Sequence, residues 1–171
     1  MLFRSLQLAQ YTATLVSGQR MQVHLLHQVL SNDQSEVLAA YEPRLIEEVP
    51  LSEEARAAIK EGMLAVTQEG SVADYFQDLT VQVGAKTGSV QVAGKDEANA
   101  VFVCFAPYDD PEIAIAIVVE QGGSGSELGS IAAGIIAYYY GEAAAISQQL
   151  PPQEGEEDAQ MEENASSSEI N

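Results

Sequence analysis

Hydrophobic positions along the first 50 residues change from helical to extended spacing. Apolar residues at helical intervals predict a helix that ends at Ser17-Gly18: Leu6, Leu8, Ala9, Ala13, Leu15 and Val16. Residues 23–30 then predict a strand, and Ser31-Asn32-Asp33 predicts a turn. A second extended piece follows over residues 36–41 and is expected to end at Pro43.

A clear amphipathic helix begins after Ser52. Ser52 is a good N-cap residue, and Glu53 and Glu54 in the first turn suit the positive end of a helix dipole. The apolar stripe consists of Ala55, Ala58, Ile59, Met63 and Val66. Gly70 supplies the stop signal. Residues 73–79 form a looser stretch.

Three predicted strands follow over residues 81–92, 98–106 and 112–120. The links between them are too short for a helical crossover, so the three strands are expected to form an antiparallel meander. Residues 113–119 are apolar at every position, which predicts burial on both faces. Glycine-rich residues 122–126 lead into a predicted helix from about Glu127 to Ile146. The order of elements predicts an α+β fold, an antiparallel sheet with helices packed on it.

The charge of the chain is negative and unevenly distributed. Seven Lys and Arg residues oppose 26 Asp and Glu residues, for a net charge of −19. This balance argues against nucleic acid and against an anionic membrane surface as partners. Residues 150–171 hold seven of the acids and no base and are almost free of apolar residues. We expect them to form a disordered acidic tail after a folded unit of residues 1–149.

Candidate nucleophiles and metal ligands are few. Cys104 is the only cysteine, and its apolar neighbours predict a buried, inert thiol. His24 and His27 are the only histidines; on a strand they would point to opposite faces, so a shared metal is not expected. No apolar run is long enough to span a bilayer, and no signal-peptide pattern opens the chain.

Two glycine-rich segments fail the tests for nucleotide-binding loops. In residues 84–89, Ala85 separates the glycine from Lys86, and the first glycine of a phosphate-binding loop is missing. In Gly123-Ser124-Gly125, the third glycine of a dinucleotide fingerprint is replaced by Leu128. A turn between a strand and a helix explains the second segment better.

Lys86-Thr87-Gly88 matches a motif of serine acyltransferases, the group that includes penicillin-binding proteins and class A β-lactamases. A cation and the hydroxyls of Thr87 and Ser89 on an exposed strand can hold a carboxylate. Gly88 would let a substrate backbone lie close to the strand, and a backbone N–H can point at a developing oxyanion. Three residues alone would not distinguish this site from a surface Lys-Thr-Gly at a strand end.

The surrounding segments extend the similarity over residues 6–141. Residues 83–92 (VGAKTGSVQV) resemble the VAGKTGTAQV segment of class B, monofunctional, penicillin-binding proteins. Residues 6–18 resemble the TPLQLA…ATLANGG helix of that family, and residues 50–66 resemble its LS…KEGM.AV helix. Residues 69–73, 102–107 and 111–125 resemble its EGGTA, WF.GFAP and PEIAVAVVVE.GG.G segments. The order and spacing of these segments make the resemblance to the C-terminal part of the transpeptidase domain specific.

The resemblance implies a peptidoglycan D,D-transpeptidase, in which a serine forms an acyl-enzyme with a D-Ala-D-Ala stem peptide or a β-lactam. In such an enzyme Lys86 supports the serine network and attracts the substrate carboxylate, which Thr87 and Ser89 bind. The Ser89 N–H forms half of the oxyanion hole, and Gly88 lines the substrate strand; Ser89 stands where Thr is commoner. Neither a cofactor nor a metal is implied. The parent protein would lie on the extracytoplasmic face of the bacterial membrane, in a cell-wall synthesis complex with a glycosyltransferase partner.

Two further motifs of the family, Ser-x-x-Lys and Ser-x-Asn, occur nowhere in the 171 residues. The nucleophile, its lysine base and the second oxyanion donor are therefore missing, and we expect the chain to be inactive alone. The abrupt start at Met1 is consistent with a truncated reading of a longer gene. Two alternatives stay open: a fragment of a β-lactamase or β-lactam sensor, and a non-catalytic module that binds peptide carboxylates.

Overall fold

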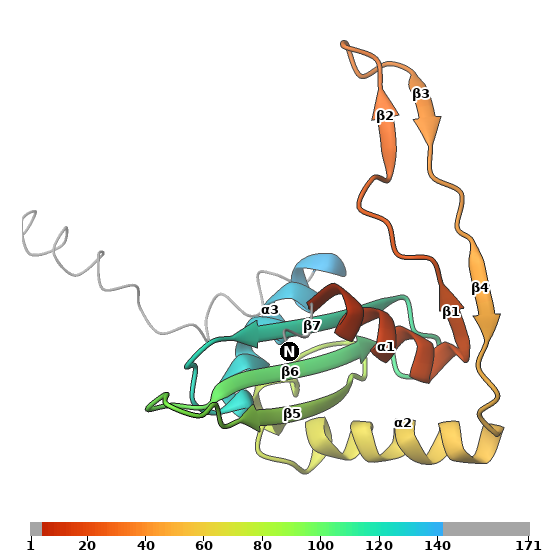
Figure 1. Ribbon diagram of the computed structural model, residues 1–171. Coiled ribbons are helices and arrows are strands. Elements are labelled where there is room, and N and C mark those ends of the chain that lie inside the picture. The colour runs from red at the N-terminus through yellow and green to blue at the C-terminus, as the bar shows by residue number, and fades with distance from the viewer. Residues whose placement is uncertain (1–4, 142–171) are drawn as a thin grey trace, which may run out of the picture.

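A three-stranded antiparallel sheet with helices on both faces forms the body of the protein, and a long two-stranded arm projects from it (Figure 1). These features come from a computed structural model, which describes residues 5–141. The α+β class and the helices packed on an antiparallel sheet are as the sequence predicts.

The sheet is a meander in the order β5 (Gly84–Val90), β6 (Asn99–Ala106) and β7 (Ile113–Val119). Thr87 lies opposite Phe102, and Phe102 lies opposite Ile117. The sequence predicted these strands and their antiparallel pairing, although the observed strands are shorter than the predicted ranges. The central strand β6 has more buried residues than β5 or β7, and its side chains enter both cores.

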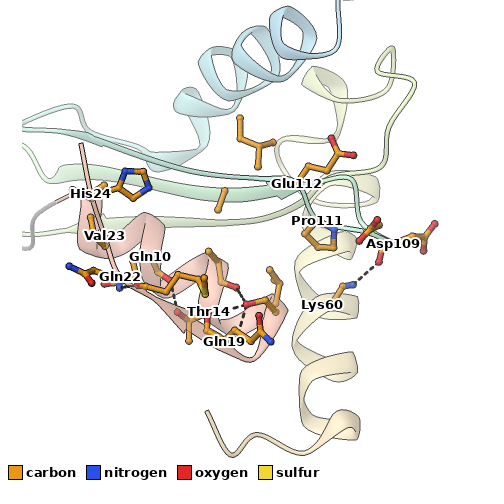
Figure 2. A pocket seen from close by; sticks show the side chains of 18 residues that line it. Gln10, Thr14, Gln19, Gln22, Val23, His24, Lys60, Asp109, Pro111 and Glu112 are labelled. Carbon is orange, nitrogen blue, oxygen red and sulfur yellow. Dashed lines mark hydrogen bonds between the residues drawn. The ribbon is translucent and has the colours of Figure 1, made fainter. Parts of the chain in front are cut away.

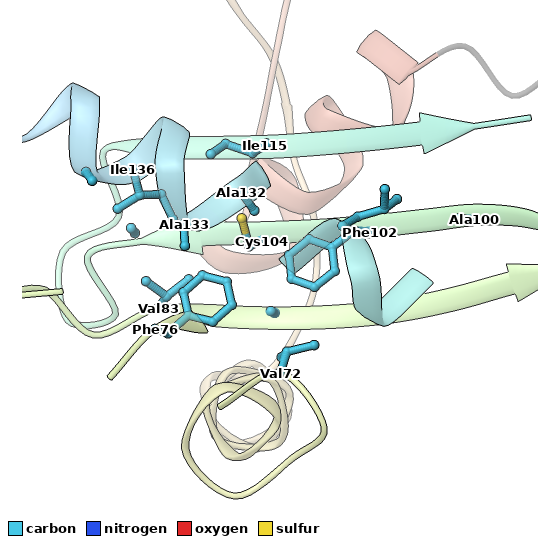
Figure 3. Packing of buried hydrophobic residues seen from close by; sticks show 14 residues of the cluster. Val72, Phe76, Val83, Ala100, Phe102, Cys104, Ile115, Ala132, Ala133 and Ile136 are labelled. Atoms are coloured by element: carbon cyan, nitrogen blue, oxygen red, sulfur yellow. The ribbon is translucent and has the colours of Figure 1, made fainter. Parts of the chain in front are cut away.

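One face of the sheet is covered by α3 (Leu128–Tyr139) and by the short 3-10 helix η1 (Ala73–Tyr75). Phe102 and Cys104 of β6 point into this core, where Phe76 stacks on Phe102 with 6.2 Å between ring centroids (Figure 3). Alanines of α3 let the helix approach the sheet closely, and Ala132 and Ala133 are buried.

The opposite face is covered by α1 (Ser5–Ser17) and α2 (Glu53–Gln68). Phe105 of β6 is fully buried there, between Val16 of α1 and Met63 of α2. The alternation of β6 side chains between the two faces follows from the two-residue period of a strand. Consequently the helices at the two ends of the described chain are held by the same strand.

The junction between α1 and α2 is fixed by polar contacts. Ser52 caps α2 as predicted, and its hydroxyl accepts a hydrogen bond from the Ala55 N–H at 3.2 Å. Arg56 of α2 donates from Nη1 to the Ser17 carbonyl at 2.8 Å. The guanidinium lies over Gly18, whose φ of +76° and lack of a side chain permit the turn after α1.

The arm (residues 19–48) is a pair of two-stranded ribbons set end to end. At its base β1 (Gln19–Met21) pairs with β4 (Leu45–Glu48), and further out β2 (Gln28–Leu30) pairs with β3 (Val37–Ala40). The arm extends away from the sheet (Figure 1). Its residues are mostly exposed, including Leu25 with 89% of its surface accessible.

Some predictions were wrong in this region and at β7. Residues 23–27 are not a strand, so the extended segment predicted over residues 23–30 shrinks to β2. His24 and His27 therefore do not alternate on a strand; the His24 ring stacks on Tyr41 with centroids 3.3 Å apart. β7 is not buried on both faces, because Ile115 is its only buried residue and the end of the strand is exposed.

The last predicted helix is observed as α3, which ends at Tyr139; Ile146 and the acidic tail lie outside the described residues. None of the described helices has the length and apolar character needed to cross a membrane.

Candidate active site

The Lys-Thr-Gly motif lies on β5, where this strand emerges from the core. Val83 and Ala85 are buried and anchor the start of the strand, and the Thr67 hydroxyl of α2 donates a hydrogen bond to the Val83 carbonyl. From Lys86 onward the strand becomes accessible, and Lys86 and Ser89 are exposed. Among the described residues β5 pairs only with β6, so its other edge has no strand partner, although α2 packs against the strand. Such an edge can receive an extended peptide as an additional strand.

The two hydroxyls of the motif share a face of the sheet, whereas Lys86 lies on the other face. Thr87 and Ser89 are opposite Phe102 and Ala100, on the side that α3 covers. Lys86 is opposite Val103, whose side chain belongs to the α1 and α2 side. The structure thus brings Thr87 and Ser89 together, and the expected grouping with the Lys86 ammonium is not formed.

The Lys86 ammonium is held by its own strand. Its Nζ donates a hydrogen bond to the Thr87 carbonyl at 2.8 Å. Gly88 has no neighbour that requires a glycine, because a Cβ built there would meet only Val101 at ordinary contact distances. No packing reason for Gly88 is therefore found within the described chain, and the predicted close approach of a substrate backbone remains a prediction.

A second segment reaches the motif from the glycine-rich turn after β7. The 3-10 helix η2 (Gly125–Glu127) packs against β5 and β6, and the Gly125 N–H donates to the Ser89 Oγ at 3.3 Å. Next to this contact, the hydroxyls of Ser71 and Ser126 lie 3.0 Å apart. Sequence reasoning missed Gly125, which it treated as part of a flexible turn. The spacing of glycines in residues 122–125 was the available signal.

Cys104, the only cysteine of the chain, lies opposite Ala85 in the sheet, next to the motif, but its side chain is buried. Cys104 is fully buried in the α3 core, and burial raises the pKa of its thiol to about 12. The prediction of a buried thiol is confirmed, and its inertness stays a prediction. In residues 5–141, no three or more His, Cys, Asp and Glu side chains are grouped so that they could bind a metal ion.

A separate pocket of about 690 Å³ lies between α1, the root of the arm and the loop before β7 (Figure 2). Lys60 of α2 closes one end, with its Nζ 3.5 Å from the Asp109 carbonyl and 4.9 Å from the centre of the Tyr108 ring. His24 and Glu112 border other parts of the pocket. None of the motif residues on β5 lines it, so this pocket is distinct from the site on the strand edge.

Comparisons with known proteins point to a single family. Residues 5–138 match the penicillin binding protein transpeptidase domain. The chain is 28% identical over 131 residues to penicillin-binding protein 2A of Bacillus subtilis, covering 68% of the chain and 18% of that protein. It is 31% identical over 88 residues to the peptidoglycan D,D-transpeptidase MrdA of Escherichia coli K12, covering 42% of the chain and 14% of that protein.

The fold agrees with this result. Penicillin-binding protein 2B of Streptococcus pneumoniae superimposes with a TM-score of 0.67 and 25% identity, over 80% of this chain and 24% of that chain. The matches with the two curated relatives span less than a fifth of the length of those proteins.

Proposed function

Because the chain belongs to the penicillin-binding protein transpeptidase family, we propose that it is the Lys-Thr-Gly portion of a peptidoglycan D,D-transpeptidase. The observation that carries this proposal is the position of residues 86–89 on an accessible strand with one open edge among the described residues. A stem peptide that ends in D-Ala-D-Ala would lie along this edge as an extended strand. β-Lactams, which mimic that terminus, would occupy the same place.

In this proposal the residues of β5 bind and orient the acyl donor. The hydroxyls of Thr87 and Ser89 donate hydrogen bonds to the terminal carboxylate, and their shared face is consistent with one ligand. The backbone N–H of Ser89 stabilises the oxyanion that develops at the scissile carbonyl. Lys86 leaves its contact with the Thr87 carbonyl to join the proton network of the nucleophile and to attract the carboxylate.

The covalent step requires a serine that these residues do not supply. The serine hydroxyl attacks the carbonyl of the penultimate D-Ala, terminal D-Ala leaves, and the amine of a second stem peptide releases the acyl group. The 171 residues contain neither Ser-x-x-Lys nor Ser-x-Asn. We therefore propose that the isolated chain binds the donor peptide weakly and does not form an acyl-enzyme.

The setting of the parent protein follows from the same proposal. Peptidoglycan crosslinking takes place outside the cytoplasm, so the parent protein would act at the extracytoplasmic face of the bacterial membrane. It would work beside a glycosyltransferase that polymerises the glycan strands whose peptides it crosslinks. The folded unit is proposed to end near residue 149, with residues 150–171 as an acidic tail.

The first experiment separates binding from acylation. The chain is incubated with benzylpenicillin, and its intact mass is measured; the expected spectrum contains only the unmodified chain. A stoichiometric adduct would show that a nucleophile is present and would overturn the proposal that the chain is inactive alone.

The second experiment tests the strand site itself. Binding of an N-acetylated peptide ending in D-Ala-D-Ala is followed by NMR for the unaltered chain, Lys86→Ala and Lys95→Ala. Lys95 is a matched control, because it lies in the loop between β5 and β6 rather than in the motif. Weaker binding of Lys86→Ala alone supports the proposal. Equal binding by all three proteins, or none by the unaltered chain, contradicts it.

A further inference from the structure

The contact between η2 and β5 involves the hydroxyl that is proposed to bind the substrate carboxylate. Ser89 is exposed at the end of the motif, and its Oγ accepts a hydrogen bond from the Gly125 N–H at 3.3 Å. A hydroxyl that accepts from one side directs its own hydrogen elsewhere. The Ser89 hydrogen is then available to a ligand on the open side of the strand.

Gly125 can make this contact only because it has no side chain. A Cβ built at this position would overlap the Gly88 and Val101 carbonyl oxygens and would come within 2.9 Å of the Gly88 nitrogen. These are backbone atoms of paired residues in the sheet, so they cannot move aside as a flexible side chain can. Any larger residue must therefore lift η2 from the strand.

The rest of the turn is fixed independently of Ser89. The Gly123 N–H donates to the Ala98 carbonyl at 3.0 Å, and the Ser126 N–H donates to the Ser124 hydroxyl at 3.3 Å. The Ser126 hydroxyl is also 3.0 Å from that of Ser71, which follows α2. These hydrogen bonds hold η2 against the part of β5 that carries the motif. The direction of the Gly125 N–H is therefore set by the fold.

We propose that Gly125 is a positioning residue for carboxylate recognition, which orients the Ser89 hydroxyl toward the C-terminal carboxylate of the peptide. It does not touch the substrate; it acts through Ser89. This inference rests on the proposed function, in which Ser89 binds that carboxylate. It predicts that Gly125 affects discrimination between a carboxylate and a neutral group at the peptide terminus.

The test compares two ligands on the full 171-residue chain. The ligands are an N-acetylated peptide ending in D-Ala-D-Ala and the same peptide with a C-terminal amide. We expect the unaltered chain to prefer the acid by about tenfold, as is typical of a hydrogen bond to a charged group. We expect Gly125→Ala to lose most of this preference. Gly134→Ala is the matched control, since a Cβ at Gly134 meets nothing within 4 Å.

A double-mutant cycle separates positioning from general loosening of the fold. If Gly125 acts through Ser89, Ser89→Ala and Gly125→Ala should each remove the preference, and combining them should remove no more than either alone. Ser89→Thr, which keeps a hydroxyl, should preserve the preference in the unaltered background and lose it beside Gly125→Ala. Circular dichroism melts establish that each variant is folded.

The outcomes distinguish the two proposals. If the unaltered chain binds acid and amide equally, the proposed function fails and this inference fails with it. If the unaltered chain prefers the acid and Gly125→Ala keeps that preference within twofold, only the role of Gly125 is refuted. Additive losses in the cycle also refute it, because they would show that Gly125 acts by another route. If Gly125→Ala does not fold, Ser89→Ala shows whether the preference for the acid depends on the hydroxyl, with Gly134→Ala as the control. A preference in Ser89→Ala equal to that of the unaltered chain refutes the inference.

Discussion

Cys104 lies in the middle of β6 with no accessible surface, between the sheet and α3. Burial favours the neutral thiol over the thiolate, and this raises its pKa from the ordinary 9.0 to about 12. Because the thiolate is the reactive form, both access and ionisation oppose modification of Cys104 in the folded protein. Its reactivity therefore reports on the opening of this core.

We expect the folded chain to react with Ellman's reagent at pH 8 at least about a hundredfold more slowly than the chain in concentrated urea. The release of thionitrobenzoate measures both rates, and Cys104→Ala gives the background. A full equivalent released at once from the folded chain would show that the thiol is accessible.

The same raised pKa has a consequence for stability. Below pH 8 the thiol is neutral in both the folded and the unfolded chain, so it does not contribute to the pH dependence of the free energy of unfolding. Above pH 9 the unfolded thiol ionises while the buried one stays protonated, and the free energy of unfolding falls as pH rises toward 12. The free energy of unfolding, measured by urea titration, should therefore fall more between pH 8 and pH 10 for the unaltered chain than for Cys104→Ala.

At the scale of single elements, α2 shows how a sequence signal becomes a contact. Ser52→Ala removes the hydroxyl that accepts the Ala55 N–H, so an amide in the first turn loses its partner. We expect a loss of about 1 kcal/mol in the free energy of unfolding, measured by urea titration. Ser52→Asp should retain most of the stability, because a carboxylate also caps the helix. Equal midpoints for Ser52→Ala and the unaltered chain would contradict this role.

The elements that could be predicted from the sequence are those whose own residues specify them. The stripe of α2 and its Ser52 cap predicted the helix almost to its observed ends. The short links around β6 likewise predicted the meander. Residues 86–89 could be singled out because the motif is contiguous in the sequence. The structure places them on a strand, β5, as predicted.

The elements that were missed depend on partners distant in the sequence. β1 and β4 are only three and four residues long, rich in charged and polar residues, and are strands because they pair with each other. Residues 113–119 suggested a strand buried on both faces, but Ile115 is the only buried residue of β7, and Val118 and Val119 at its end are exposed. The spacing of glycines in residues 122–125 marked a turn but not the role of Gly125, because that role depends on Gly88 and Ser89, which are distant in the sequence.

At the scale of the whole molecule, the two cores meet at the sheet, and Phe102 fills the centre of the larger one. It has no accessible surface and stacks on Phe76, which belongs to the segment between α2 and β5. Phe102→Ala would remove these contacts and leave a cavity beneath α3. We expect the free energy of unfolding to fall by about 3–5 kcal/mol, which is a large part of the stability of a small domain.

Calorimetry is the appropriate measurement for Phe102→Ala, because it also reports whether unfolding stays cooperative. Phe102→Leu is the milder comparison and should lose less than the alanine variant, since it keeps part of the buried volume. Unchanged melting of Phe102→Ala would mean that α3 does not depend on this core.

The arm has a further consequence for how the protein tolerates changes in length. Gln19 pairs with Glu48, and the Val49 N–H donates to the Gly18 carbonyl at 2.8 Å, so the two ends of the arm are joined at its base. Residues inserted or deleted beyond β1 and β4 therefore need not displace α1 from α2. Loop closure adds only about 0.6 kcal/mol for each doubling of loop length. The arm can thus lengthen, shorten or accept a grafted peptide while the motif strand on the body keeps its place.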